Sequence, residues 1–169
     1  MKSRILPFLP LRDGVLLPGT TATIPVGRAA SVARVTAVEP GASVVVGVQK
    51  DAAVVDPSMA DLQPLAVLAR VQHVQRLPRG YQVTLEGQER VQVTELVKQT
   101  PYLTVKIEAA PDFVSDESAQ SDLVRALKAE LKELEDKAQG PLVRTIEALG
   151  DEDDASALAD RTAAALGLP

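Results

Sequence analysis

Few residues of this chain are of a type that could carry chemistry. Its 169 residues include no cysteine and one histidine, His73. Without thiols there is no disulfide, no thiolate nucleophile and little means of holding a structural zinc ion. A lone histidine also lacks the second imidazole or thiol that a metal site needs. We therefore interpret His73 as a surface or bulge residue and expect neither a metal nor a cofactor in this chain.

The acidic residues offer two patterns that resemble sites. Asp151–Asp154 is a run of four carboxylates without the glycine and terminal glutamate of an EF-hand calcium loop. Carboxylates at a helix start are stabilised by free N–H groups and by the helix dipole, so we interpret this run as helix capping. Glu86 and Glu89 flank Gly87, and we interpret them as solvated carboxylates of a turn rather than as a catalytic acid and base.

Motifs for nucleotide binding and nucleophilic catalysis are missing. The one lysine followed by serine or threonine is Lys2, and no glycine-rich turn precedes it as a P-loop requires. No Gly-x-Ser-x-Gly elbow occurs. Aromatic residues make up 2% of the chain, which argues against a base-stacking surface. A weak basic patch could be formed by Arg70, Arg76, Arg79 and Arg90. Nucleic acid is not expected, but an RNA-binding protein and a small hydrolase with an unrecognised site stay open as alternatives.

Composition and charge divide the chain in two. Residues 1–110 hold 12 Lys and Arg against 9 Asp and Glu and are rich in valine, whereas residues 111–169 hold 6 against 14 and are rich in alanine and leucine. Valine suits strands and alanine and leucine suit helices. This predicts an α+β protein with a β-rich unit over 1–110 and a helical segment over 111–169. No apolar run approaches the length of a membrane span, and Ile5–Leu11 is broken by prolines, so we expect a cytoplasmic protein.

Alternation of apolar and polar residues predicts strands within the first unit. Three strands with one wet face are expected over 81–86, 90–94 and 103–109. Upstream, the apolar parity of 65–71 switches at Val74, which predicts a bulge of the kind that bends strands in barrels. Pro78–Gly80 predicts a tight hairpin turn.

A further strand over 43–48 is apolar on both faces and predicts burial on both sides. We expect the segment Arg28–Val38, with apolar residues at every third position, to form a covering helix. Together these elements predict a small closed or nearly closed barrel.

Three helices are expected in the second unit. Leucines at 123, 127, 131 and 134 form an apolar stripe, and Glu133 and Lys137 form a favourable pair four residues apart. Ser115 or Asp116 can cap the first helix, and Gly140 is expected to end it. Pro141 suits the first turn of a second helix running to Gly150, and an alanine-rich third helix follows the acidic run.

Several stretches resemble the Lon protease N-terminal domain, also called the LON substrate-binding domain. The resemblance runs in order through Leu6–Gly19, Ile24–Arg28, Val48–Lys50 with Asp56–Pro57, Leu77–Val91 and Asp153–Asp160. It implies a PUA-like pseudo-barrel followed by a helical bundle, the latter shorter here than in the full family domain. It also implies a non-catalytic part of a cytoplasmic, hexameric, ATP-dependent protease that helps to recognise unfolded or damaged proteins.

The resemblance implies that ATP and Mg²⁺ belong to a downstream domain with the Ser-Lys peptidase, beyond the end of this sequence. A free-standing LON-domain adaptor is the alternative. The resemblance implies partner contacts at Arg28 and Arg79. Two departures from the family pattern bear on these contacts: Ala29–Ala30 replaces the charged pair that often follows Arg28, and Arg79 replaces the usual aspartate of the hairpin. The apolar residues expected to contact substrate are Leu16, Leu17, Pro18, Leu77, Pro78 and Tyr81. The alternative for these six residues is that they pack the rim of the barrel.

Overall fold

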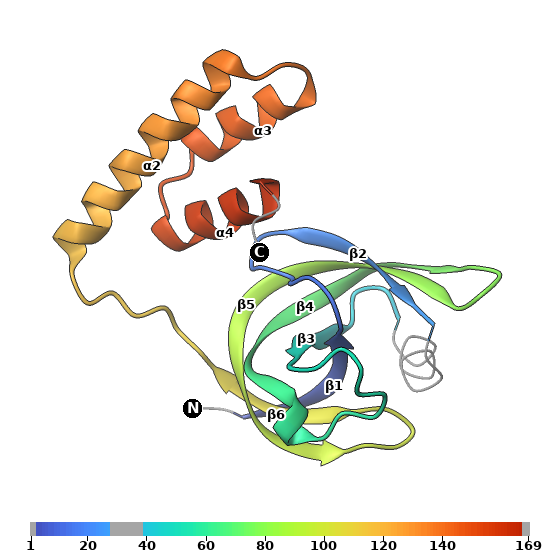
Figure 1. The fold of residues 1–169 in the computed structure, drawn as a ribbon. Helices are drawn as coiled ribbons and strands as arrows, with labels where there is room; N and C mark the ends of the chain where they lie inside the picture. Colours follow the sequence, from blue (N-terminus) through green and yellow to red (C-terminus); the bar gives the residue numbers. More distant parts are fainter. Residues whose placement is uncertain (1–2, 28–38, 167–169) are drawn as a thin grey trace. The chain divides into compact units, whose positions relative to one another are not determined.

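Six strands and three α-helices make up the part of the chain that the computed structural model describes, residues 3–27 and 39–166 (Figure 1). The α+β fold class predicted from the composition is confirmed. Contacts divide the chain into two units, Met1–Pro111 and Asp112–Pro169. The strands are β1 (Arg4–Leu11), β2 (Thr21–Val26), β3 (Ser43–Gln49), β4 (Leu62–Arg76), β5 (Tyr81–Lys98) and β6 (Thr104–Ala109).

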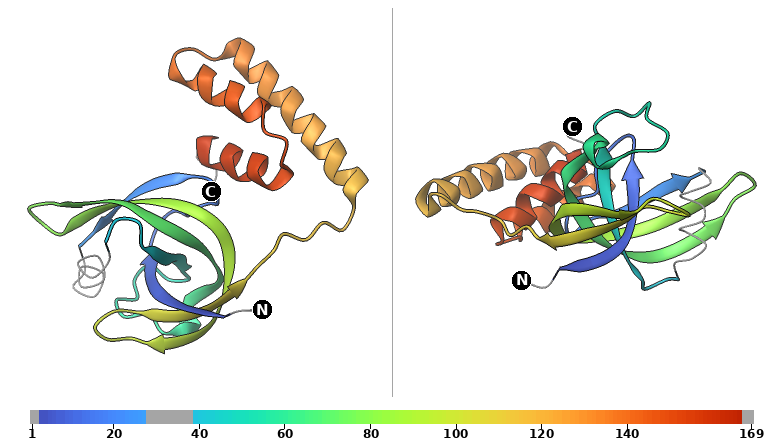
Figure 2. Two further views of the ribbon diagram at one scale, coloured as in Figure 1. Left: turned by 180° about the vertical axis from the view of Figure 1, so that it is seen from behind. Right: turned by 90° about the horizontal axis from the view of Figure 1, so that it is seen from below.

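The first unit is a closed ring of five strands with a sixth strand outside it. Strands pair in the order β1–β3–β4–β5–β6, and β6 pairs back onto β1 (Figures 1 and 2). β1 pairs with two strands: Arg4–Pro7 pairs with β6, and Phe8–Leu11 pairs with β3. Among the described residues, β2 pairs only with β5, so it forms an edge of the sheet.

The longest strand corrects one prediction. β5 runs through Glu86, Gly87 and Glu89 without a turn. Its register against β4 shifts between the pairs Leu68–Glu89 and Ala69–Gly87, so one extra residue is accommodated there as a bulge. The prediction of a turn at Gly87 is therefore wrong. A single 18-residue strand bends here, and its first half pairs with β2 and its second half with β6.

The parity switch in β4 is confirmed as a bulge. Register against β5 shifts between Val71 and His73, which leaves Gln72 as the extra residue. The hairpin between β4 and β5 is confirmed as well, with Leu77 N–H donating to the carbonyl of Gly80 at 3.1 Å.

Two apolar clusters fill the first unit. β3 contributes to both, because Val44 and Val46 belong to one cluster and Val45 to the other. All three are 3% exposed or less, which confirms that this strand is covered on both faces. The helix expected over Arg28–Val38 lies outside the described residues.

The second unit holds α2 (Glu117–Lys137), α3 (Pro141–Gly150) and α4 (Ala155–Leu166). The Asp116 carboxylate accepts from the backbone N–H groups of Ser118 at 2.9 Å and Ala119 at 3.0 Å, as an N-cap does. α2 ends three residues before Gly140, which lies instead at the start of α3.

The leucine stripe of α2 is only partly right. Leu131 is buried with Ile146, Leu149 and Leu158, and Val124 and Leu127 pack against that cluster. Leu123 is 71% exposed and Leu134 is 42% exposed. Positions 124, 127 and 131 share one helix face, and Leu123 lies off it. Leu134 follows Leu131 by three residues on the same side of α2, but it is not part of the buried cluster.

No helix among the described residues is long and apolar enough to cross a membrane.

Candidate functional site

The loop before β2 is fixed to β5 by its backbone. Thr20 N–H donates to the Leu17 carbonyl at 3.2 Å and closes a turn with Pro18 at its second position, where the fixed φ of proline fits. Gly87 N–H donates to the Thr20 carbonyl, and Gly87 accepts from Gly19 N–H, both at 2.9 Å. A Cβ at Gly87 would lie 2.3 Å from the Leu17 oxygen, so only glycine allows this approach.

These hydrogen bonds establish which backbone groups of β2 point away from β5. The backbone carbonyl of Thr20 points toward β5. Because backbone groups alternate along a strand, those of Ala22, Ile24 and Val26 also point toward β5. The backbone groups of Thr21, Thr23 and Pro25 point away from β5.

Two further observations agree with this assignment. The Thr23 and Thr84 hydroxyls are 3.2 Å apart, as expected of opposite residues that exchange no backbone hydrogen bonds. Pro25 has no N–H and is tolerated because its nitrogen faces the edge of β2 that pairs with no described strand.

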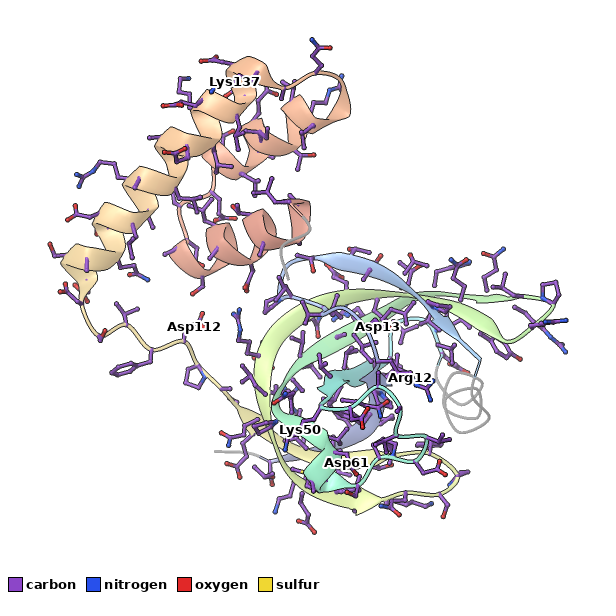
Figure 3. The ribbon with its side chains drawn as sticks, viewed as in Figure 1. Arg12, Asp13, Lys50, Asp61, Asp112 and Lys137 are labelled. Carbon is purple, nitrogen blue, oxygen red and sulfur yellow. The ribbon has the colours of Figure 1, made fainter. Side chains whose placement is uncertain are left out.

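A cleft of about 330 Å³ lies where the ends of β1 and β2 approach each other. It is lined by Leu9, Pro10, Leu11, Arg12, Asp13, Ile24, Pro25, Val26 and Gly27. Leu9, Leu11 and Val26 are 7% exposed or less and belong to the core, so the cleft opens onto apolar side chains of the barrel interior. Arg12 and Asp13 are exposed and place one positive and one negative charge on its lining (Figure 3).

Proline marks the β1 side of the cleft as well. Phe8 N–H donates to the Leu103 carbonyl at 2.9 Å, so the backbone N–H of Phe8 points away from β3. Pro10, two residues later, faces the same way by strand alternation. Each of the two strands that line the cleft therefore has a proline on an edge that pairs with no described strand there.

The first predicted contact region is buried at Leu16 and half-buried at Leu17 and Pro18. Leu16 is 4% exposed and belongs to the same core cluster as Val26, so its side chain presents no surface. Leu17 and Pro18 are half-buried in the turn on Gly87. The burial of Leu16 agrees with the alternative that this residue packs the barrel, and Leu16 is not part of the contact surface proposed below.

The second predicted region lies at the other end of β2. Tyr81 pairs with Val26 and packs against the core, Leu77 is half-buried, and Pro78 and Arg79 are exposed in the hairpin turn. Thr21 to Val26 spans about 17 Å of strand, so the two regions do not merge into one patch. Arg28 lies outside the described residues.

The cleft was not predicted from the sequence. Its lining comes from Leu9–Asp13 and Ile24–Gly27, which we had not predicted as strands. The available signal was a proline inside each apolar stretch, which is typical of an edge strand.

Two carboxylates outside the cleft, Asp61 and Asp154, accept hydrogen bonds that stabilise local structure. Ser58 donates to the Asp61 carboxylate through its hydroxyl at 2.6 Å and its N–H at 2.9 Å. These bonds, with the nearby Lys50 ammonium, hold the pKa of Asp61 below its ordinary value. Asp154 accepts from Ala157 N–H at 2.7 Å, which confirms that the acidic run caps a helix.

The polar pairs considered as chemistry are also accounted for. Glu89 accepts from Arg4 at 2.7 Å and Glu86 from Gln72 at 3.2 Å, both exposed. His73 is exposed and lies opposite Thr84 in the β4–β5 ladder. No group of three or more metal-binding side chains occurs within residues 3–27 and 39–166.

Proteins of known identity match this chain along most of its length. Lon protease 4 of Sorangium cellulosum is 36% identical over 163 residues, which are 96% of this chain and 20% of that protein. The Lon protease of Koribacter versatilis is 36% identical over 124 residues, 73% of this chain and 15% of that protein. The chain thus spans a fifth or less of the length of these curated relatives.

A solved structure has the same fold. The N-terminal domain of the Mycobacterium avium complex Lon protease aligns with a TM-score of 0.65 at 20% identity, covering 95% of this chain and 81% of that one. The family model of the ATP-dependent protease La (LON) substrate-binding domain matches residues 5–169. The chain therefore belongs to the LON substrate-binding domain family.

Proposed function

We propose that this chain is the substrate-recognition part of an ATP-dependent Lon-type protease and that it holds unfolded or damaged polypeptides at the cleft between β1 and β2. The supporting observation is an open cleft whose lining includes core leucines and a core valine, in a chain of this family. Apolar, undemanding contact suits unfolded chains, which share exposed apolar side chains rather than a sequence.

The chain itself contributes binding and no bond cleavage. Asp61, Asp116 and Asp154 are caps, Glu89 and Glu152 are in ion pairs, and Asp160 is buried within α4. ATP, Mg²⁺ and the peptidase belong to a downstream domain of the proposed parent protease. Further subunits of that protease would present further copies of the cleft in a hexamer.

Each copy should bind weakly. Burial of about 300 Å² of apolar surface gains about 7 kcal/mol, and the cost of association removes most of it. A dissociation constant of tens of micromolar or weaker is expected for one domain. Six linked copies would raise the apparent affinity through effective concentration, without any new contact.

Titration of the full chain with reduced, carboxymethylated lactalbumin tests the proposal. Heteronuclear NMR shifts should concentrate on Leu9–Asp13 and Ile24–Gly27, and native lactalbumin, which buries its apolar residues, should cause none. Absence of binding to the unfolded form would refute the proposal, and nanomolar binding by a single domain would refute the weak, multivalent mechanism.

A further inference from the structure

We infer that the outward edge of β2 binds an extended polypeptide segment by strand addition, with the segment's apolar side chains in the cleft. This inference rests on the proposed function and specifies how the substrate is held. It combines two observations that meet at β2: an edge that pairs with no described strand, and an apolar cleft beside it.

The edge has the hydrogen-bonding groups that an added strand needs. Thr21 and Thr23 each direct an N–H and a carbonyl away from β5, and Pro25 adds a carbonyl. Backbone groups occur in every polypeptide, so such a ladder gives affinity without sequence preference, while a pocket beside it selects side chains.

The composition of the edge favours an uncharged apolar segment. Thr21–Val26 contains no charged residue, and the cleft adds one cation and one anion, Arg12 and Asp13, so the site has no net charge to select a charged ligand. The apolar floor of Leu9, Leu11 and Ile24 suits alternate side chains of a strand.

The same geometry limits pairing of this edge with the edge of a second copy. Edge strands are commonly protected by proline, charge or short length. β2 has six residues, and Pro25 removes one donor from the edge that pairs with no described strand. The ladder of backbone hydrogen bonds is therefore short, so binding of the segment should be weak and reversible.

Thr23→Pro tests the inference on the full chain. It deletes one outward N–H and leaves the β5 ladder intact, because Thr23 exchanges no backbone hydrogen bond with Thr84. The probe is an acetylated and amidated ten-residue peptide in which valine alternates with serine, followed by fluorescence anisotropy. One net backbone hydrogen bond corresponds to about a fivefold weakening, and the proline ring adds a steric block.

Thr23→Val is the matched control, because it removes the hydroxyl and keeps the N–H. Thr23→Pro should bind the peptide about fivefold more weakly than Thr23→Val. If Thr23→Pro binds like Thr23→Val while both keep the wild-type circular dichroism melt, strand addition is refuted.

A measurement on the unaltered chain covers the case in which Thr23→Pro fails to fold. Two versions of the peptide carry N-methyl groups on all valines or on all serines, so each loses the donors of one strand edge only. One version should lose binding and the other should retain it. Equal binding, or equal loss, overturns the inference. Retained binding of unfolded lactalbumin in that case leaves the proposed function standing, whereas loss of all polypeptide binding refutes the function itself.

Discussion

Replacing Gly87 by alanine should loosen the loop that leads into β2. The added Cβ would lie 2.3 Å from the Leu17 oxygen and 3.0 Å from the Leu17 carbonyl carbon, both of which are backbone atoms that cannot rotate away. Ordinary contact begins at 3.4 Å, so the loop must retreat by about 1 Å.

The loss in free energy of unfolding follows from the hydrogen bonds between this loop and β5. Two hydrogen bonds of 2.9 Å, from Gly19 N–H and to the Thr20 carbonyl, would stretch beyond useful length. Each contributes about 0.5–1.5 kcal/mol, and partial exposure of Leu16 adds about 1 kcal/mol, so the barrel should lose about 2–4 kcal/mol. With a urea slope of about 2 kcal/mol per molar, the midpoint should fall by about 1–2 M.

Tyrosine fluorescence provides an assay specific to the barrel. The chain has no tryptophan, and Tyr81 and Tyr102 both lie in the first unit. Gly27→Ala is the matched control, since a Cβ there meets nothing within 4 Å. A Gly87→Ala midpoint equal to that of Gly27→Ala and the wild type would show that the loop does not depend on this close approach.

Three further changes test other parts of the structure. Asp116→Ala should remove the cap of α2 and cost about 1 kcal/mol, seen as an earlier urea transition in the 222 nm circular dichroism signal and not in tyrosine fluorescence. Because hydrogen bonds from Ser58 lower the pKa of Asp61 in the folded state, this carboxylate stabilises the fold above its ordinary pKa of 3.8, and that stability is lost as pH falls through the lowered value. Asp61→Asn should therefore show a smaller drop in urea midpoint between pH 7 and pH 3 than the wild type, and an equal drop would contradict the assignment. Leu16→Ala should destabilise the barrel by about 2–5 kcal/mol, seen as a lower melting temperature. Loss of polypeptide binding with an unchanged melting temperature would show instead that Leu16 contacts the substrate.

Elements with regular patterns could be predicted from the sequence. α3 begins at Pro141 and ends at Gly150, as the turn chemistry indicates, and the parity switch before Val74 located a real bulge. These features are local, because each depends on residues a few positions apart.

Features set by distant parts of the chain could not be predicted. Gly87 has the residue type of a turn, but its function depends on Leu17, 70 positions away, which no local pattern reveals. The cleft was missed for the same reason: prolines interrupt the alternation of β1 and β2, and their positions make sense only once the pairing of each strand is known. Leu123 fits a helical stripe, yet the face that packs was decided by α3 and α4.

Closure of the ring by β1 and β6 has a consequence for the order of events during synthesis. Arg4 pairs with Ile107, so about a hundred residues must leave the ribosome before the first strand meets its second partner. Pairings of such sequence separation are slow to form, whereas helices form from near neighbours. Until then the nascent barrel exposes unpaired strand edges, and a domain proposed to bind unfolded chains passes through a stage in which it resembles its own substrates.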